Sequence, residues 1–260
     1  MSRDKQACRG LGIASVMGMV CAPWVAQADV IDDSHFKVDT RNFYLHRNYT
    51  NTNAPVSEVH SWSQGFDAQF TSGYTDTALA VGLDVDAQYA LRLDSSGNDG
   101  SLPFSVHDQQ TANDYSRAGA TLKMRYSKTE LKVGDLRPQY PVAFDDPSRQ
   151  LDTLYQGAVV ESKEVDGLTL TGGRFWSAVT RESSNHEKLY KFGSTDNLDS
   201  DGLDFGGATY DISKNLQASY FYGVLHDIYQ QHYFGLMHMA DLGSGYKLKT
   251  DLRYFNNNED

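Results

Sequence analysis

The chain has 260 residues, a formal net charge of −11 and a mean hydropathy of −0.53. This acidic composition argues against a nucleic-acid-binding protein, because binding to a phosphate backbone requires clustered basic residues. No apolar run outside the N-terminal segment approaches the ~18 residues that a membrane helix needs, which argues against a helical membrane protein.

Residues 1–28 are predicted to be a cleaved signal peptide. Three basic residues precede a mostly apolar stretch from Leu11 to Val20, and Ala26-Gln27-Ala28 supplies an A-x-A cleavage site before Asp29. Both cysteines lie in this segment, so the mature chain has none and needs no disulfide in the oxidising compartment it enters. Removal of the segment leaves 20 basic and 33 acidic residues, a net charge of −13.

Residues 29–260 are predicted to form eleven antiparallel β-strands. The clearest runs from Leu79 to Asp94, where every odd position is apolar and every even position is small or polar. A strand of this length suits a tilted crossing of a bilayer, which takes about 9–11 residues, better than a soluble sheet. In chain order the predicted strands are Phe36–Leu45, Trp62–Phe70, Leu79–Asp94, Tyr115–Tyr126, Thr129–Gly134, Leu154–Ser162, Leu168–Trp176, Leu203–Tyr210, Leu216–Leu225, Tyr229–Met239 and Tyr246–Phe255.

The connections between these strands mostly alternate between short and long. Short turns are centred near residues 73, 127, 165, 213 and 243, and long polar loops near 53, 104, 144 and 188. Outer-membrane barrels have short periplasmic turns and long external loops, whereas a soluble sandwich has no reason to sort its loops by end. We therefore predict an all-β fold, a transmembrane antiparallel up-and-down β-barrel.

Several segments together resemble the OprD-type porins, which are substrate-specific outer-membrane channels for carboxylates and amino acids. The resemblance covers the mature chain in order and implies a barrel of about 18 strands, of which about eleven are present. It also implies that the third loop, residues 135–153, folds inward and that basic side chains on the wall guide anionic groups. The segments are Arg41-Asn42, Asp114–Gly119, Leu131–Gly134, Ser148–Leu151, Gly167–Leu170 and Asp227–Tyr229.

The residues that match this solute path are basic, with two acidic residues opposite them. A row of guanidinium groups offers a carboxylate weak successive sites that it can enter and leave. An alternative is that the wall cations only form cross-strand ion pairs with Asp84, Asp86 or Asp94. The acidic pair is either the opposing wall of the constriction or solvated loop carboxylates. The path residues are Arg41, Arg117, Lys123, Arg125 and Arg149, with Asp145 and Asp146 opposite.

The leading functional hypothesis is a porin for passive, selective diffusion of small carboxylates or amino acids. The alternatives are an outer-membrane barrel enzyme of lipase or protease type and a periplasmic or secreted β-protein that binds a ligand. No sequence motif of a hydrolase, a P-loop or a metal site is evident, so neither catalysis nor a cofactor is expected. The expected partners are small anionic or zwitterionic solutes, outer-membrane lipid and lipopolysaccharide. The sequence does not distinguish between a monomeric and a trimeric state.

The count of eleven strands also predicts that residues 29–260 are not a complete channel. Single-chain bacterial barrels close with an even number of strands. An open sheet edge in hydrocarbon would leave unpaired N–H and C=O groups, each at a cost of several kcal/mol. We therefore expect this segment to be the N-terminal part of a larger barrel.

Overall fold

The computed structural model describes residues 27–50, 57–97, 100–105, 107, 109–191 and 198–259. Most of the predicted signal peptide, residues 1–26, lies outside the described residues. A short helix, α1 (Gln27–Asp32), spans the predicted cleavage position and precedes the first strand. Within the described residues no helix has the length and apolar character needed to cross a membrane, a finding that does not bear on β-barrels.

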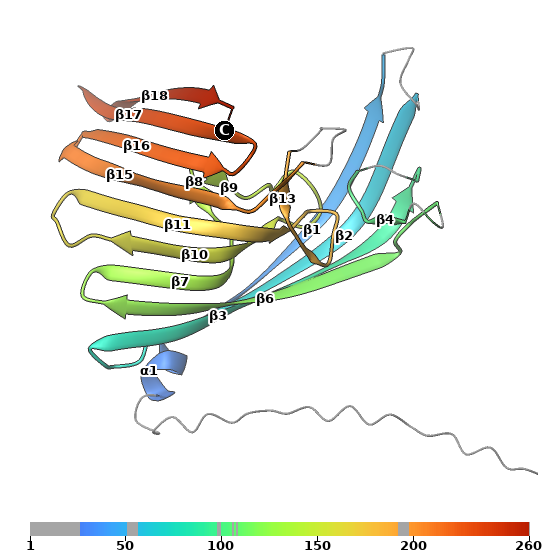
Figure 1. Ribbon diagram of the computed structural model, residues 1–260, viewed down its shortest axis with the longest axis horizontal. Coiled ribbons are helices and arrows are strands. Elements are labelled where there is room, and N and C mark those ends of the chain that lie inside the picture. Colours follow the sequence, from blue (N-terminus) through green and yellow to red (C-terminus); the bar gives the residue numbers. More distant parts are fainter. Residues whose placement is uncertain are drawn as a thin grey trace, which may run out of the picture.

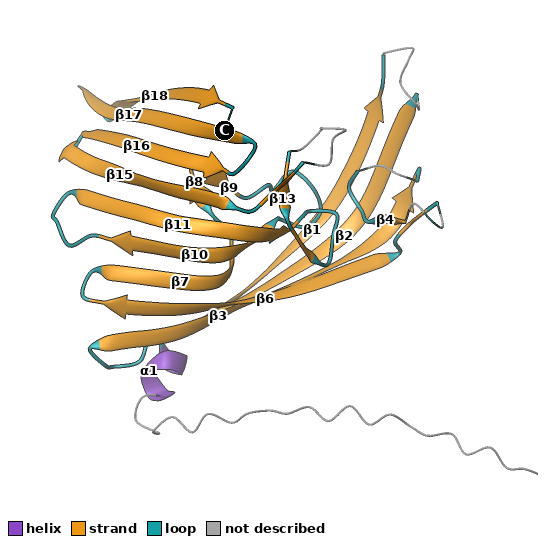
Figure 2. Ribbon diagram, viewed as in Figure 1, coloured by secondary structure: helices purple, strands orange, loops and turns teal. Residues whose placement is uncertain are grey.

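The described chain forms one large, curved antiparallel sheet, as Figure 1 and Figure 2 show. Each main strand pairs with its neighbours in sequence, and β1 and β18 lie at the two ends of the order. All eleven predicted strands are present in the predicted order, most of them longer than expected. They are β1 (His35–Asn48), β2 (Glu58–Thr71), β3 (Leu79–Ser95), β6 (Asp114–Tyr126), β7 (Thr129–Leu136), β10 (Leu154–Ser162), β11 (Leu168–Val179), β15 (Leu203–Ser213), β16 (Leu216–Leu225), β17 (Tyr229–Gly243) and β18 (Tyr246–Asn258).

The alternation in the sequence sets the two faces of the sheet. On β3 the odd apolar positions such as Leu83 and Val85 are exposed, while Gln88 and Ala90 point to the inner face and are buried. The register continues the same outward row across neighbouring strands, since Ala68, Ala87 and Ala118 are cross-strand partners. The outer face is thus apolar, as a lipid-facing barrel surface requires.

The connections sort by end as predicted. Short turns join β6 to β7, β10 to β11, β15 to β16 and β17 to β18 at one end of the sheet, and the long loops lie at the other (Figure 1). The turn after β10 contains Gly167 at φ +77°, a conformation that favours glycine. The long loops contain short strands that the periodicity did not predict: β4 (Phe104–Ser105), β5 (Gln110–Thr111), β8 (Gln139–Tyr140), β9 (Ala143–Phe144), β12 (His186–Glu187), β13 (Leu189–Tyr190) and β14 (Asp199–Ser200).

The largest buried cluster lies where the third loop meets the inner face of β10, β11, β15 and β16. Phe175 is fully buried and stacks on Phe205 with ring centroids 5.4 Å apart. Tyr140 of β8 packs on Phe205 at 5.2 Å, and Val142 and Ala143 belong to the same cluster. This apolar contact, together with polar anchors described below, holds the loop against the inner wall.

Candidate functional site

The third long loop lies against the inner face of the sheet. Because β7 continues to Leu136, the loop spans residues 137–153 and begins two residues later than predicted. Its residue Gln150 contacts both β2 and β1. The Ser63 hydroxyl of β2 donates to Gln150 Oε1 at 2.8 Å, and Gln150 Nε2 donates to the Arg41 carbonyl of β1 at 3.1 Å. The approach is possible because Gly65 has no side chain, since a Cβ there would lie 1.9 Å from Gln150 Nε2. These contacts hold the loop against β1 and β2.

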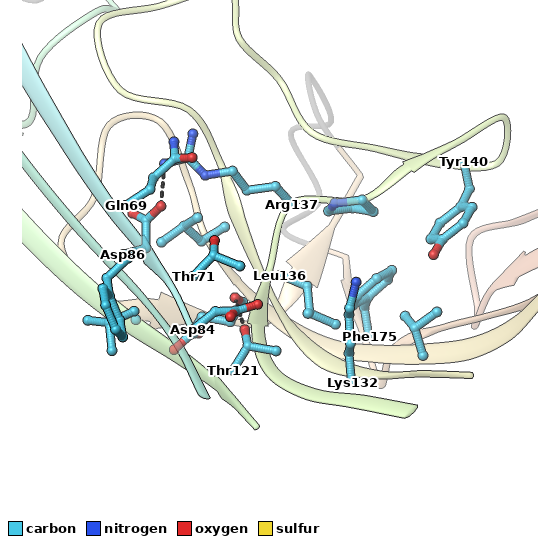
Figure 3. A pocket seen from close by; sticks show the side chains of 17 residues that line it. Gln69, Thr71, Asp84, Asp86, Thr121, Lys132, Leu136, Arg137, Tyr140 and Phe175 are labelled. Atoms are coloured by element: carbon cyan, nitrogen blue, oxygen red, sulfur yellow. Dashed lines mark hydrogen bonds and ion pairs between the residues drawn. The ribbon is translucent and has the colours of Figure 1, made fainter. Parts of the chain in front are cut away.

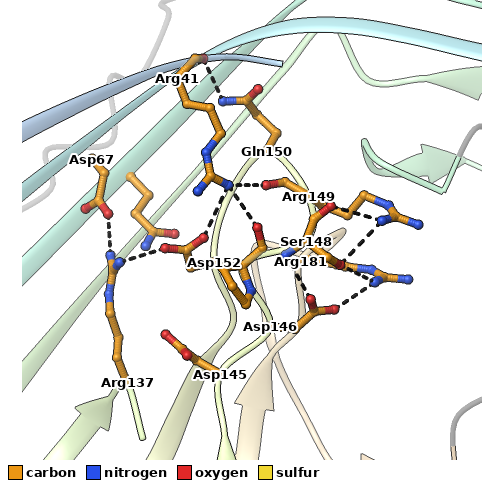
Figure 4. A network of polar contacts seen from close by, with 12 residues as sticks. Arg41, Asp67, Arg137, Asp145, Asp146, Ser148, Arg149, Gln150, Asp152 and Arg181 are labelled. Carbon is orange, nitrogen blue, oxygen red and sulfur yellow. Dashed lines mark hydrogen bonds and ion pairs between the residues drawn. The ribbon is translucent and has the colours of Figure 1, made fainter. Parts of the chain in front are cut away.

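Arg137, at the start of the loop, is the centre of a charge network (Figure 4). Its Nη2 lies 2.7 Å from Asp67 and 2.5 Å from Asp86, and its Nη1 lies 3.1 Å from Asp152. Burial lowers the pKa of Arg137, but the carboxylates of Asp86 and Asp67 outweigh burial and leave the pKa raised. Arg137 therefore stays charged and ties the loop to β2 and β3.

Arg41 of β1 also contacts this loop from the wall. Its Nη1 donates to the carbonyls of Pro147 at 3.1 Å and Arg149 at 2.5 Å, and it lies 3.5 Å from Asp152. The Arg41 side chain is 41% exposed, so part of it stays accessible to solvent.

Arg117 of β6 is almost fully buried, at 6% exposure. Its Nε donates to Gln88 Oε1 at 2.5 Å, its Nη1 donates to the Thr180 carbonyl at 2.6 Å, and its Nη2 donates to the Asp152 carbonyl. These bonds tie the wall to both the third loop and the fourth long loop, residues 180–202. The side chain faces inward as predicted, yet its donors are used by the protein itself.

Lys123 and Arg125 differ in their surroundings, although they share a face of β6. Lys123 is 4% exposed, and its Nζ lies 2.7 Å from Asp84 and 2.7 Å from the Ser72 carbonyl. Lys123 therefore forms a cross-strand ion pair with Asp84, which is the arrangement described by the alternative interpretation of the wall cations. Arg125 is exposed at the end of the strand, where its guanidinium lies over the Tyr74 ring.

Arg149 lies partly buried in the third loop, where its Nε donates to the Gly100 carbonyl at 2.9 Å. Burial lowers its pKa, and the nearby positive charges of Arg181 and Arg47 lower it further. Three guanidinium groups from β1, the third loop and the fourth loop therefore lie near one another at the loop end of the wall, with the carboxylates of Asp146 and Glu182 beside Arg181.

The two loop carboxylates predicted opposite these cations have different environments. Asp145 is 6% exposed and accepts a hydrogen bond from the Gln139 amide, and burial raises its pKa, as does the nearby Asp152. Asp146 lies 2.7 Å from Arg181. Burial raises the Asp146 pKa, but hydrogen bonds from Ser148 and the charge of Arg181 outweigh it, so the pKa lies below its usual range.

Two open cavities flank the Arg137 side chain. The larger, of about 340 Å³, is lined by side chains of both signs, among them Lys37, Asp39 and Arg41. The smaller, of about 240 Å³, is shown in Figure 3 and is lined by Asp84, Asp86 and Lys132, among others. The inner wall near the third loop therefore carries side chains of both signs. Residues that could jointly hold a metal ion are absent from the described part of the chain.

Sequence reasoning did not single out Arg137, Asp67 or Arg181. Strand parity predicts inward-facing positions for Asp67 and Asp86, and this parity is the one signal that the sequence offers. Their partner Arg137 is separated from Asp67 by 70 residues, and no local pattern indicates that contact.

The comparisons with known proteins agree with this architecture. The family model "outer membrane porin, OprD family" matches residues 28–260. The porin-like protein GalP of Pseudomonas putida is 37% identical over 228 residues, which cover 86% of this chain and 55% of that protein. The chain thus spans about half the length of the curated relatives it matches.

Two solved structures of Pseudomonas aeruginosa show the same fold. OccK9 (OpdG) superposes with a TM-score of 0.83 at 35% identity, covering 89% of this chain and 60% of that one. OpdK with vanillate superposes with a TM-score of 0.79 at 31% identity, covering 89% of this chain and 59% of that one. Proteins of this kind are channels of the outer membrane of Gram-negative bacteria and not enzymes. The chain belongs to the OprD family of outer-membrane porins.

Proposed function

We propose that the protein forms a passive, substrate-selective channel for small carboxylates or amino acids. The observation that carries this proposal is the third loop, which is fixed inside the wall by Arg137 and presents Arg149 beside Arg181 and Arg47. A positively charged narrowing favours anionic groups, and a planar guanidinium pairs well with a carboxylate.

A solved relative supports the choice of carboxylates. OpdK, at 31% identity, was crystallised with vanillate, a small aromatic carboxylate. The wall of this chain also has a half-exposed inward carboxylate, Asp39, which provides a counter-charge for the ammonium group of an amino acid. Small carboxylates and zwitterions are therefore the solute classes that we propose, with the outer face in lipid and lipopolysaccharide.

The contacts divide the predicted path residues into two groups. Arg117 and Lys123 are buried and bound to protein groups, so we assign them to the stability of the wall and loops. Arg41, Arg149 and Arg125 keep exposed or partly exposed guanidinium groups, and we assign the solute path to them.

The test is a measurement of ion preference in planar bilayers with the full natural chain. Replacement of Arg149 with Gln should shift the reversal potential in an asymmetric salt gradient toward weaker anion preference. The matched control is Lys128→Gln, which removes the same charge from the exposed turn after β6. An Arg149→Gln channel with the same reversal potential as the control would contradict the proposal.

A further inference from the structure

The third loop does not fill all the space between itself and the sheet. The cavity of about 340 Å³ is lined by Asp67 of β2 and by Asp152 of the loop, among others. The cavity of about 240 Å³ is lined by Thr71 of β2 and by Pro138 of the loop, among others. Each cavity thus has one side on the wall and one side on the loop, and together we call them the wall gap.

The Arg137 side chain divides the wall gap into its two cavities. Arg137 and Gln69 line both of them, whereas Asp86 lines only the smaller and Asp67 only the larger (Figure 3). The Arg137 guanidinium contacts both of these carboxylates, at 2.5 Å and 2.7 Å, and also lies 3.1 Å from Asp152 of the loop (Figure 4). It therefore fills the passage from one cavity to the other and binds the wall to the loop at that point.

The lining of the wall gap is polar on both sides of Arg137. Among the described residues, Oδ1 of Asp67, Oδ1 of Asp86 and Nε2 of Gln88 are buried and have no hydrogen-bond partner from the protein. Gln88 is only 2% exposed and lines the larger cavity. Buried polar atoms beside a cavity of this size are ordinarily satisfied by water, because each water needs only about 10–15 Å³ and two to four polar partners. The wall gap is thus suited to water and small ions.

We propose that Arg137 determines the selectivity of the channel as a seal, because it closes a second path for water and small ions behind the third loop. Without its guanidinium the two cavities join, and the carboxylates of Asp67, Asp86 and Asp152 line the passage between them. A passage lined by one sign of charge favours ions of the opposite sign, so the opened wall gap conducts cations. The inference rests on the proposed function, since the seal directs solutes past the front of the third loop.

The third loop has further anchors that remain when Arg137 is replaced. Gln150 stays bonded to β1 and β2, and Arg117 stays bonded to the Asp152 carbonyl. Val142 and Ala143 stay in the apolar cluster on the inner face. Loss of the seal therefore opens the wall gap while the loop keeps its place.

The test is single-channel recording of the full natural chain in planar bilayers with potassium chloride. Arg137→Ala should raise the conductance and shift the reversal potential in an asymmetric gradient toward cation preference. Lys128→Gln is the control, because it removes one positive charge from an exposed turn away from the wall gap and should leave the conductance at the wild-type value. A rise in conductance distinguishes an added path from a change of charge in the existing one.

A triple variant separates an open wall gap from a displaced loop. Adding Asp67→Asn and Asp86→Asn to Arg137→Ala removes the unpaired carboxylates, so this variant also serves where Arg137→Ala alone does not assemble. Its conductance should stay above the wild-type value, while its reversal potential returns toward that of the wild type. Wild-type conductance in the triple variant would overturn the seal, since it would show that the unpaired charges had displaced the loop.

A thiol placed in the smaller cavity gives a second readout, since residues 29–260 contain no cysteine. Thr71 lines this cavity, and Thr71→Cys changes its size little (Figure 3). A trimethylammonium methanethiosulfonate reagent, which forms a disulfide with the thiol, should remove the added conductance of Arg137→Ala with Thr71→Cys. It should change the conductance little in Thr71→Cys alone and in Arg137→Ala alone. Persistence of the added conductance after modification would contradict a path through the wall gap.

The failure of the seal and the failure of the proposed function give different results. Wild-type conductance and reversal potential in Arg137→Ala would overturn the seal, and the proposed function would stand if the wild type still passes small carboxylates. A wild-type channel that passes no small carboxylate would overturn both.

Discussion

Arg137 provides the sharpest test of how the third loop is held. Replacing it with Gln removes the cation that contacts Asp67, Asp86 and Asp152 together. These four side chains are only 15% to 21% exposed. Removing one partner from a buried ion pair costs about 3–5 kcal/mol, and from an exposed pair about 0–1 kcal/mol. With about a fifth of each side chain exposed, we expect Arg137→Gln to lower the free energy of unfolding by about 2–4 kcal/mol.

The assay is urea unfolding of the full natural chain in lipid vesicles, followed by tryptophan fluorescence. The matched control is Arg174→Gln, whose pair with Asp204 has both side chains more than 40% exposed, and which should cost less than about 1 kcal/mol. Adding Asp67→Asn and Asp86→Asn to Arg137→Gln should recover half or more of the loss, because it removes the unpaired charges. An Arg137→Gln effect no larger than the control, or no recovery in the triple variant, would refute the role of this network.

Three other outcomes follow from the structure and the sequence. Gly65→Ala should destabilise the protein by about 1–3 kcal/mol and increase single-channel current noise, because its Cβ displaces the buried Gln150 amide; unchanged unfolding and noise would contradict this. The pKa of Asp146 is lowered, so its ion pair with Arg181 stabilises the loop fully at pH values above the usual Asp pKa of about 3.9. This stabilisation is lost as the pH falls through the lowered pKa of Asp146. Conductance should therefore become noisier at such low pH in the wild type and less pH-dependent in Asp146→Asn, and equal profiles would argue against it. Intact-mass measurement of the mature protein should place its first residue at Asp29, and any other start would refute the predicted cleavage site.

The strands were predictable because their information is local. The sixteen-residue alternation from Leu79 to Asp94 fixes both the strand and the face of each side chain, and the sheet contains it as β3 (Leu79–Ser95). The inward orientation of Arg117 and Lys123 followed from the same parity and agrees with their burial. The alternation of short and long connections identified the two ends of the sheet for a similar reason.

The partners of those side chains were not predictable, because they come from loops that return from far along the chain. Arg117 donates to the Thr180 carbonyl 63 residues away, and strand periodicity carries no information about that contact. The sequence predicts only a short turn near residue 73, and this prediction carries no information about where the Tyr74 ring lies. The alternation along a strand predicts that a cation lies on the inner face. The contacts that the folded loops make with this cation determine whether it is accessible to a solute.

The most direct test of the central claim is solute uptake by liposomes that contain the purified full natural chain. Selective diffusion predicts faster swelling in small carboxylates and amino acids than in neutral sugars of similar mass, with the carboxylate advantage reduced in Arg149→Gln. Equal swelling rates for charged and neutral solutes of the same size, or no swelling above protein-free liposomes, would contradict it.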